Sequence, residues 1–279
     1  MIISASYRSD IPAFHGGWFG ARLAEGFVDV PNPYGAKPYR VSLAPADVDG
    51  FVFWTRNTRP FHAGLDAAAA VAPFMVTYTV TGYPEQLERG VPPVAHAVTE
   101  VARLASHHGP RAVVWRYDPV LWTDLTPAGF HRQNFARLAD RLSPHVDEVT
   151  FSAATLYAKS TRNLKRMAPG VAVADPDDAA KRDLLAELGA IAVDHGLRPT
   201  VCSQPHLLSG PLQPAACIDT ARLSDIAGHP VHARQKGNRP GCACAESRDI
   251  GRYDSCAHGC AYCYAVRDHS KVVLGTVSA

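Results

Sequence analysis

The C-terminal part of the chain carries three cysteines at a spacing that could hold a metal cluster. They are Cys256, Cys260 and Cys263, a C-x3-C-x2-C pattern in which Tyr262 directly precedes the last cysteine. Thiolates this close in sequence can converge on one point, and iron–sulfur clusters are held by cysteines at short spacings. A [4Fe–4S] cubane needs four ligands, so three cysteines leave one iron free to bind a cofactor or substrate. Gly259 allows a positive φ that would bring backbone N–H groups towards the sulfurs.

The other four cysteines form a candidate second group. They are Cys202, Cys217, Cys242 and Cys244. Four thiolates would complete a second [4Fe–4S] cluster for electron transfer or for structure. Structural zinc also takes four thiolates, and Cys202 and Cys217 could instead be ordinary buried thiols. The long separation of Cys202 from Cys217 departs from the paired knuckles of zinc sites, and this favours a cluster.

Composition and charge set broad limits on the function. The 279 residues are 47% hydrophobic and 19% charged, with a net charge of +2, which is ordinary for a globular protein. The small charge disfavours a large nucleic-acid interface. No apolar run approaches the roughly 18 residues that span a membrane, and the first residues do not resemble a signal peptide. We therefore expect a cytoplasmic protein, in which seven cysteines favour metal or redox chemistry over disulfides.

The elements that must position these cysteines alternate between strands and helices. Several strand-like runs are almost continuously apolar, as in strands buried on both faces of a parallel sheet. The expected strands are Ile2–Ser6, Gly50–Trp54, Phe74–Val80, Ala112–Tyr117, Glu148–Ser152 and Pro199–Ser203. Six such units predict an α/β fold, a partial (β/α)6 barrel of the TIM type. We expect residues 1–204 to form this barrel, and residues 205–279 to form a cysteine-rich tail that folds back onto its mouth within one integrated domain.

Helical patterns separate the expected strands. Asp10 is suited to cap a helix that runs to Gly26, where a glycine ends it. Further helices are expected over Pro93–His108, from Thr126-Pro127 onward, and over Asp178–His195, each with apolar residues at helical spacing.

Polar residues follow the expected strands at their carboxyl ends, where barrels and open α/β sheets place their sites. Arg8, Arg56 and Arg116 could hold carboxylates or phosphates. Asp10 and Asp118 could pair with these arginines, bind a ribose or move a proton. The structural alternative is that both aspartates serve as a helix cap and a turn, or only neutralise buried arginines.

His258 is the one histidine inside the triplet loop. It could tune a cluster by a hydrogen bond to sulfur, or it could instead face solvent or a backbone carbonyl.

The triplet with its preceding tyrosine resembles the signature of the radical S-adenosylmethionine superfamily. In that superfamily three cysteines hold a [4Fe–4S] cluster whose fourth iron binds the amino and carboxylate groups of S-adenosylmethionine, and reductive cleavage yields a 5′-deoxyadenosyl radical. The usual fold is a full or partial (β/α)6 barrel. The resemblance implies that Cys256, Cys260 and Cys263 hold the cluster and that Tyr262 belongs to the cofactor site. Thr81-Gly82 is the nearest match to the glycine-rich motif that contacts S-adenosylmethionine.

One departure from the superfamily concerns the position of the triplet. The superfamily places it after the first strand, whereas here it follows all six expected strands. The tail must then belong to a permuted barrel or cross the barrel mouth from outside.

The whole chain also resembles a bacterial family defined as a domain of unknown function, with a radical-SAM-like cysteine cluster at its C-terminus. The residues that carry this resemblance are Ile2–Phe14, Phe53–Asn57, Trp115–Pro119 and Cys242–Tyr264. Members of that family usually have a basic residue at the position of Tyr7 and lysine at that of Arg56. If either side chain contacts the substrate, the resemblance implies that this chain accepts a different one.

The leading hypothesis is a radical-SAM-like iron–sulfur enzyme with a catalytic cluster on the triplet and an auxiliary cluster on the other four cysteines. Its cofactors would be one or two [4Fe–4S] clusters and S-adenosylmethionine. Its partners would be a substrate, of a class the sequence does not indicate, and a reductant such as ferredoxin or flavodoxin. The alternatives are an electron-transfer or redox-sensing protein, and a zinc-stabilised barrel hydrolase.

Overall fold

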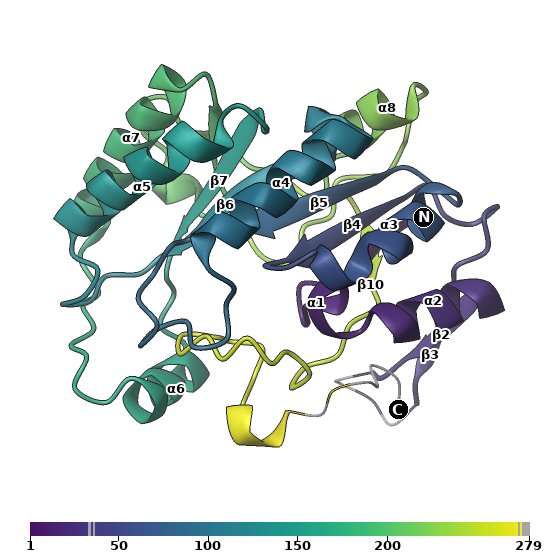
Figure 1. Ribbon diagram of the computed structural model, residues 1–279, viewed down its shortest axis with the longest axis horizontal. Helices are drawn as coiled ribbons and strands as arrows, with labels where there is room; N and C mark the ends of the chain where they lie inside the picture. Colours follow the sequence, from purple (N-terminus) through teal and green to yellow (C-terminus); the bar gives the residue numbers. More distant parts are fainter. Residues whose placement is uncertain (33–34, 36, 273, 275–279) are drawn as a thin grey trace.

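A parallel sheet forms the centre of the computed structural model, which describes residues 1–32, 35, 37–272 and 274 (Figure 1). The strands of this sheet are β1 (Ile2–Ala5), β4 (Gly50–Thr55), β5 (Phe74–Thr79), β6 (Val113–Val120), β7 (Glu148–Ala153), β8 (Arg198–Val201), β9 (Gln213–Pro214) and β10 (Ser247–Asp249). Their order is β10-β1-β4-β5-β6-β7-β8-β9, and every neighbouring pair is parallel. A separate antiparallel hairpin pairs β2 (Phe27–Val30) with β3 (Tyr39–Ser42).

All six expected strands are confirmed, but the expected barrel is not. The eight-stranded sheet is open, with β9 at one edge and β10 at the other. The physical reason lies after β8, where the chain adds only the two residues of β9 and then crosses to the opposite edge to pair β10 with β1. The crossing segment covers one face of the sheet, which in a closed barrel would be filled by the strands' own side chains.

Most of the helices cover the other face of the sheet, and the tail runs past the carboxyl ends of the strands (Figure 1). The helices are α1 (Ile11–Phe14), α2 (Gly16–Glu25), α3 (His62–Ala69), α4 (Val94–His108), α5 (Ala128–Leu142), α6 (Ala158–Met167), α7 (Asp178–Asp194) and α8 (Thr220–Ala227), and short 3-10 turns lie at Arg59–Phe61, Pro110–Ala112, Pro205–Leu207 and His269–Lys271. The helix expected from Asp10 to Gly26 is two helices, since the chain leaves helical geometry at His15. Its two ends are confirmed: Asp10 caps α1 and Gly26, at φ 76°, ends α2.

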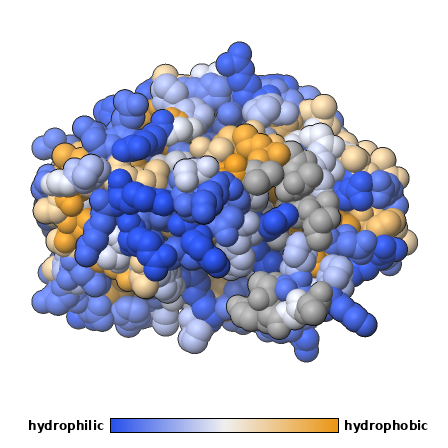
Figure 2. Space-filling model, turned by 90° about the horizontal axis from the view of Figure 1, so that it is seen from below, coloured by the Kyte–Doolittle hydropathy of each residue, from blue (hydrophilic) through white to orange (hydrophobic). Residues whose placement is uncertain are grey.

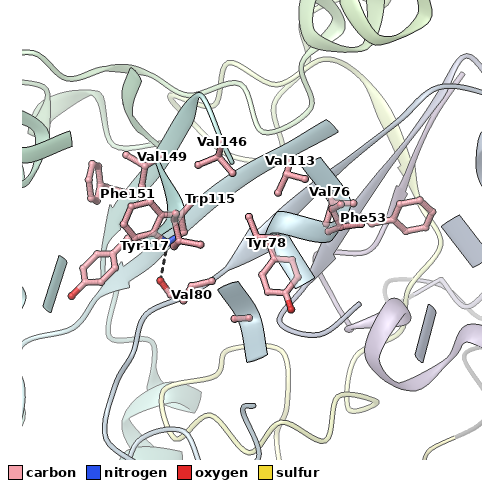
Figure 3. Packing of buried hydrophobic residues seen from close by; sticks show 14 of the residues in the cluster. Phe53, Val76, Tyr78, Val80, Val113, Trp115, Tyr117, Val146, Val149 and Phe151 are labelled. Atoms are coloured by element: carbon pink, nitrogen blue, oxygen red, sulfur yellow. Dashed lines mark hydrogen bonds between the residues drawn. The ribbon is translucent and has the colours of Figure 1, made fainter. Parts of the chain in front are cut away.

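The main core lies between the sheet and helices α2, α3, α4, α5 and α7. Trp115 of β6 stacks on Phe135 of α5 with ring centroids 4.9 Å apart, and its indole N–H donates to the Val80 carbonyl at 2.9 Å (Figure 3). Each large apolar side chain buried in this way contributes about 1.5–3 kcal/mol. The core therefore fixes the strands whose carboxyl ends carry the polar residues.

The second face of the sheet is covered by residues 215–245, which include α8. Leu223 of α8 packs with Val52 and Met75, and Gly50 leaves room for it, because a Cβ there would lie 3.0 Å from the Leu223 side chain. Arg222 is fully buried and pairs with Glu148 at 2.7 Å. These contacts bring the segment that carries Cys217, Cys242 and Cys244 against the sheet. None of the described helices is long and apolar enough to cross a membrane.

Candidate functional site

The triplet loop, residues 256–263, lies against the segments that follow β1, β4 and β5. Ala261 N–H donates to the Leu87 carbonyl at 2.9 Å, and Gly90 N–H donates to the His258 carbonyl at 2.8 Å. Gly90 has to be a glycine here, since a Cβ would lie 2.9 Å from that carbonyl oxygen. Gly259 takes the expected positive φ, at 67°. The tail thus passes the carboxyl ends of the strands, but neither expected route applies as stated, because the sheet is open and β10, just before the triplet, is one of its strands.

Asp10 ties this loop to the sheet. Its carboxylate accepts from the backbone N–H of Arg56 at 2.8 Å and from Thr55 Oγ1 at 2.7 Å, and it lies 2.7 Å from His258 Nε2. His258 is only 3% exposed, and its other ring nitrogen lies 3.2 Å from the Gly90 carbonyl oxygen. The expected contact with a carbonyl is confirmed, and the alternative that His258 faces solvent is wrong. Asp10 therefore acts on the triplet loop through His258.

Arg56 joins the triplet loop to the loop after β5. Its guanidinium donates to the Tyr262 hydroxyl at 2.7 Å and to Thr81 Oγ1 at 3.2 Å, and it pairs with Glu88 at 3.0 Å. Glu88 also accepts hydrogen bonds from Thr81 and Tyr262. Sequence reasoning missed Glu88, because it stands in an irregular loop with no motif around it.

The triplet sulfurs lie in a buried environment that includes backbone donors. The N–H of His258 donates to Cys256, and those of Ala265 and Val266 donate to Cys263. Burial raises the pKa of the Cys256 and Cys263 thiols, and it raises the pKa of Cys260 to about 12 although Arg56 opposes this. Buried thiols of this kind ionise when a metal cation replaces the proton.

The four other cysteines meet in one contiguous group, which we call the quartet. The sulfurs of Cys202 and Cys217 lie 3.5 Å apart, and further thiol hydrogen bonds join Cys217 to Cys244 and Cys244 to Cys242. Ile218 N–H donates to Cys244 Sγ at 3.4 Å. The hydrogen bond with Cys244 lowers the pKa of Cys242 to about 5. The structure therefore brings together all four cysteines that the sequence grouped.

The expectation that Arg116 and Asp118 stand at the end of a strand is wrong, because β6 runs on to Val120 and contains both residues. Arg116 connects this strand to the quartet. Its Nη1 donates to Cys217 Sγ at 2.9 Å, and its Nε donates to Asp118 at 3.1 Å. Asp118 also accepts a hydrogen bond from Ser152. Burial opposes ionisation of Asp118, but Arg116 outweighs it and holds the pKa of this carboxyl below its usual value. The guanidinium of Arg116 is thus shared between a sulfur and a carboxylate.

Arg8 lies further along the same edge of the sheet, beside Asp249 of β10. Its Nε is 3.7 Å from the Asp249 carboxylate, and its guanidinium lies 5.4 Å from the centre of the Tyr253 ring. Asp249 accepts from Ser4 Oγ at 2.8 Å and from Ser6 Oγ at 2.9 Å. Sequence reasoning did not assign a role to Asp249, whose partners lie more than 240 positions away. These hydrogen bonds hold β10, which precedes the triplet loop, against β1 and the residues that follow it.

Thr81 and Gly82 line a cavity of about 350 Å³ at the end of β5. Arg56 and Glu88 also line this cavity, and both contact Tyr262. Thr81, Gly82 and Tyr262, grouped in the sequence as candidate cofactor residues, are therefore neighbours in space.

The three triplet sulfurs are not gathered as they would be around a single metal ion, whereas neighbouring quartet sulfurs are in contact, with those of Cys202 and Cys217 3.5 Å apart. Among the described residues, three metal-binding side chains with all ligand atoms within 4.8 Å of one another occur only at Asp66, His107 and His108. Four thiolates around one zinc, at Zn–S of about 2.3 Å, would lie about 3.8 Å apart. A cubane places its ligands on separate corner irons, so its sulfurs lie further apart.

These observations define a class of protein: an α/β protein with an open parallel sheet and two separate cysteine groups at its carboxyl edge. The chain belongs to the family described as Domain of unknown function (DUF1848), whose model matches residues 2–265. The match confirms the resemblance to a family of unknown function along almost the whole chain. No curated protein matches the chain.

Proposed function

We propose that this protein is a radical-SAM-like iron–sulfur enzyme, with a catalytic cluster on Cys256, Cys260 and Cys263 and an auxiliary cluster on the quartet. The observation that carries the proposal is the grouping of all seven cysteines into two sets, of three and of four, along one edge of the sheet. A set of three leaves one coordination position for a cofactor, whereas a set of four completes a closed site.

The triplet fits a cluster better than zinc, because its three sulfurs do not all lie within 4.8 Å of one another. Backbone N–H groups donate to Cys256, Cys263 and Cys244. Hydrogen bonds to the sulfurs are among the features that set the potentials of iron–sulfur clusters. When bound, a reduced cluster supplies the electron that cleaves S-adenosylmethionine into methionine and a 5′-deoxyadenosyl radical.

The residues of the chain would position the cofactor and keep water out rather than carry the hard chemistry. Arg56, Glu88 and Tyr262 hold the triplet loop by a closed set of hydrogen bonds. Asp10 orients the ring of His258, a residue of the same loop. We therefore assign Arg56 and Asp10 as positioning residues. Arg8 stays a candidate to bind an anionic group, with its Nε already 3.7 Å from the Asp249 carboxylate.

The test is anaerobic reconstitution with iron and sulfide, reduction, and addition of S-adenosylmethionine. The proposal predicts formation of 5′-deoxyadenosine and a change in the EPR signal of the reduced protein. Reversible reduction without either effect would instead identify an electron-transfer or redox-sensing protein. Zinc without iron or acid-labile sulfide in anaerobically purified protein would identify a zinc-stabilised protein.

A further inference from the structure

The cavity of about 350 Å³ at the carboxyl end of β5 has the size of a small-molecule site. It lies between the end of β5, the loop over residues 82–93 and the first turn of α4. Its deep side is formed by Arg56 and Glu88, the same pair that holds Tyr262 of the triplet loop. A ligand in the cavity would therefore contact the residues that position this loop.

The rim of the cavity carries one charge of each sign. Glu85 and Arg89 are both exposed lining residues, and neither has an ion-pair partner in the described part of the chain. The guanidinium of Arg89 is anchored on the Met167 carbonyl, which is neutral. In contrast, Arg56 and Glu88 neutralise each other at 3.0 Å. The rim thus offers one cation and one carboxylate that no opposite charge neutralises in the described part of the chain.

Thr79 and Thr81 form polar parts of the lining, and the rest of the wall between the rim and Arg56 is apolar. Val80, Tyr83, Val91, Val94 and Ala97 contribute to it. An apolar wall below two opposite charges is complementary to a zwitterion with an apolar side chain. An α-amino acid carries an ammonium group for Glu85 and a carboxylate for Arg89 on the same carbon.

The cavity is not suited to the end of S-adenosylmethionine that would bind the triplet. No cysteine lines it, whereas a group that completes the coordination of a three-cysteine cluster must reach that cluster. Thr81 and Gly82 are thereby assigned to this cavity rather than to the cofactor.

We propose that this cavity binds a free α-amino acid with an apolar side chain, as the substrate of the proposed reaction. The ammonium group is held by Glu85, the carboxylate by Arg89, and the side chain by the wall that includes Val94 and Ala97. The role of the amino acid as substrate rests on the proposed function, whereas its binding to the cavity does not depend on a cluster.

Equilibrium dialysis of the full chain, with and without reconstituted clusters, tests the binding. The probes are the proteinogenic amino acids measured singly, with 4-methylpentanoate and 3-methylbutylamine as analogues of leucine that lack the ammonium or the carboxylate group. We expect at least one apolar amino acid to bind, and each leucine analogue to bind on the order of tenfold more weakly than leucine, since each loses one charge-assisted contact. Failure of all apolar amino acids to bind at millimolar concentration, or binding of an analogue as tight as that of leucine, would overturn the inference.

Single-residue variants distinguish a loss of the amino-acid site from a general effect on the protein. Glu85→Gln and Arg89→Gln should each weaken amino-acid binding about tenfold, and Ala97→Phe should abolish it by filling the cavity. Arg132→Gln is the matched control, because Arg132 is an exposed residue outside the lining, paired with Glu187. Unchanged binding in both charge variants would contradict the proposed contacts. Binding without 5′-deoxyadenosine formation would refute the proposed function and leave the amino-acid site standing.

Discussion

Nη1 of Arg116 lies 2.9 Å from Sγ of Cys217, so a buried guanidinium donates directly to a sulfur of the quartet. The same side chain pairs with Asp118. Arg56 has a comparable position at the triplet, where it pairs with Glu88 and bonds Tyr262 rather than a cysteine. Each cysteine group is thus accompanied by a buried arginine paired with a carboxylate, but among the described residues only the quartet has a sulfur in hydrogen-bond contact with its arginine.

Removing the contact between Arg116 and Cys217 should lower the reduction potential of the quartet cluster. A cation that donates to a sulfur stabilises the more negative, reduced cluster. A hydrogen bond involving a charged group is worth about 1.5–3 kcal/mol, which for one electron corresponds to roughly 60–130 mV. We expect a shift of this size in a potentiometric EPR titration of Arg116→Gln in an Asp118→Asn background.

The Asp118→Asn single variant is the reference, because in it no carboxylate is left buried without its partner. Arg56→Lys serves as the control at the triplet and should leave the quartet potential unchanged. An equal potential in the Arg116 variant and its reference would show that the contact does not tune the quartet.

Substitution of Asp10 should weaken the triplet loop. Asp10→Asn puts an N–H group where the carboxylate accepts from Arg56 N–H and His258, so one buried donor loses its partner. The expected cost is about 2 kcal/mol in the free energy of unfolding, measured by chemical denaturation, together with a lower iron content after reconstitution. Asp29→Asn, on the exposed hairpin, should change neither quantity. Equal iron content in Asp10→Asn and the parent chain would refute a positioning role for Asp10.

The free energy of unfolding should decrease as the pH is lowered, because His131 of α5 is buried. This ring is fully buried, with Nδ1 2.9 Å from the Tyr117 hydroxyl and Nε2 3.1 Å from the Leu121 carbonyl oxygen. Burial lowers its pKa from 6.5 to about 4. The unfolded chain therefore binds a proton that the folded chain does not, and stability present above pH 6.5 is lost as the pH falls towards 4.

The loss attributable to His131 should reach about 3 kcal/mol at pH 4. Denaturation curves between pH 7 and pH 4 would measure it, and His131→Gln should show a shallower pH dependence. His232→Gln, at an exposed position, should keep the dependence of the parent chain. A His131→Gln variant with the same pH dependence as the parent would show that this histidine is not the cause.

Iron content should report the two cysteine groups separately. If each group holds a cubane, the reconstituted chain should contain about eight irons, and loss of either group should leave about four. Cys256→Ala with Cys260→Ala tests the triplet, and Cys217→Ala with Cys244→Ala tests the quartet. A quartet variant that keeps the full iron content of the parent would place the second cluster elsewhere.

The sequence predicted local structure better than closure of the sheet. Continuous apolar runs such as Phe51–Trp54 predicted buried parallel strands, because such runs reflect burial on both faces. The open sheet depends instead on β10, a strand of three residues that pairs with β1 across more than 240 positions. A strand this short has no periodic pattern in the sequence. Only the folded chain shows that β10 occupies the edge of the sheet next to β1.

The triplet could be predicted because its three cysteines are closely spaced, and the quartet because four further cysteines remained in a chain expected to lack disulfides. The residues that hold the two groups in place could not be predicted. Glu88 and Asp249 act through partners distant in the sequence, and each carboxylate would look the same on an exposed loop. Arg116 was predicted at a strand end but lies within β6, and its contact with Cys217 depends on how residues 215–245 pack across the sheet.

The most direct test of the central claim isolates the triplet. A Cys217→Ala, Cys244→Ala chain, reconstituted and reduced without oxygen, should contain one [4Fe–4S] cluster on Cys256, Cys260 and Cys263. We predict that addition of S-adenosylmethionine changes the EPR spectrum of this cluster, because the open position binds the cofactor. An identical spectrum before and after the addition, from a chain with its full triplet cluster, would contradict the account.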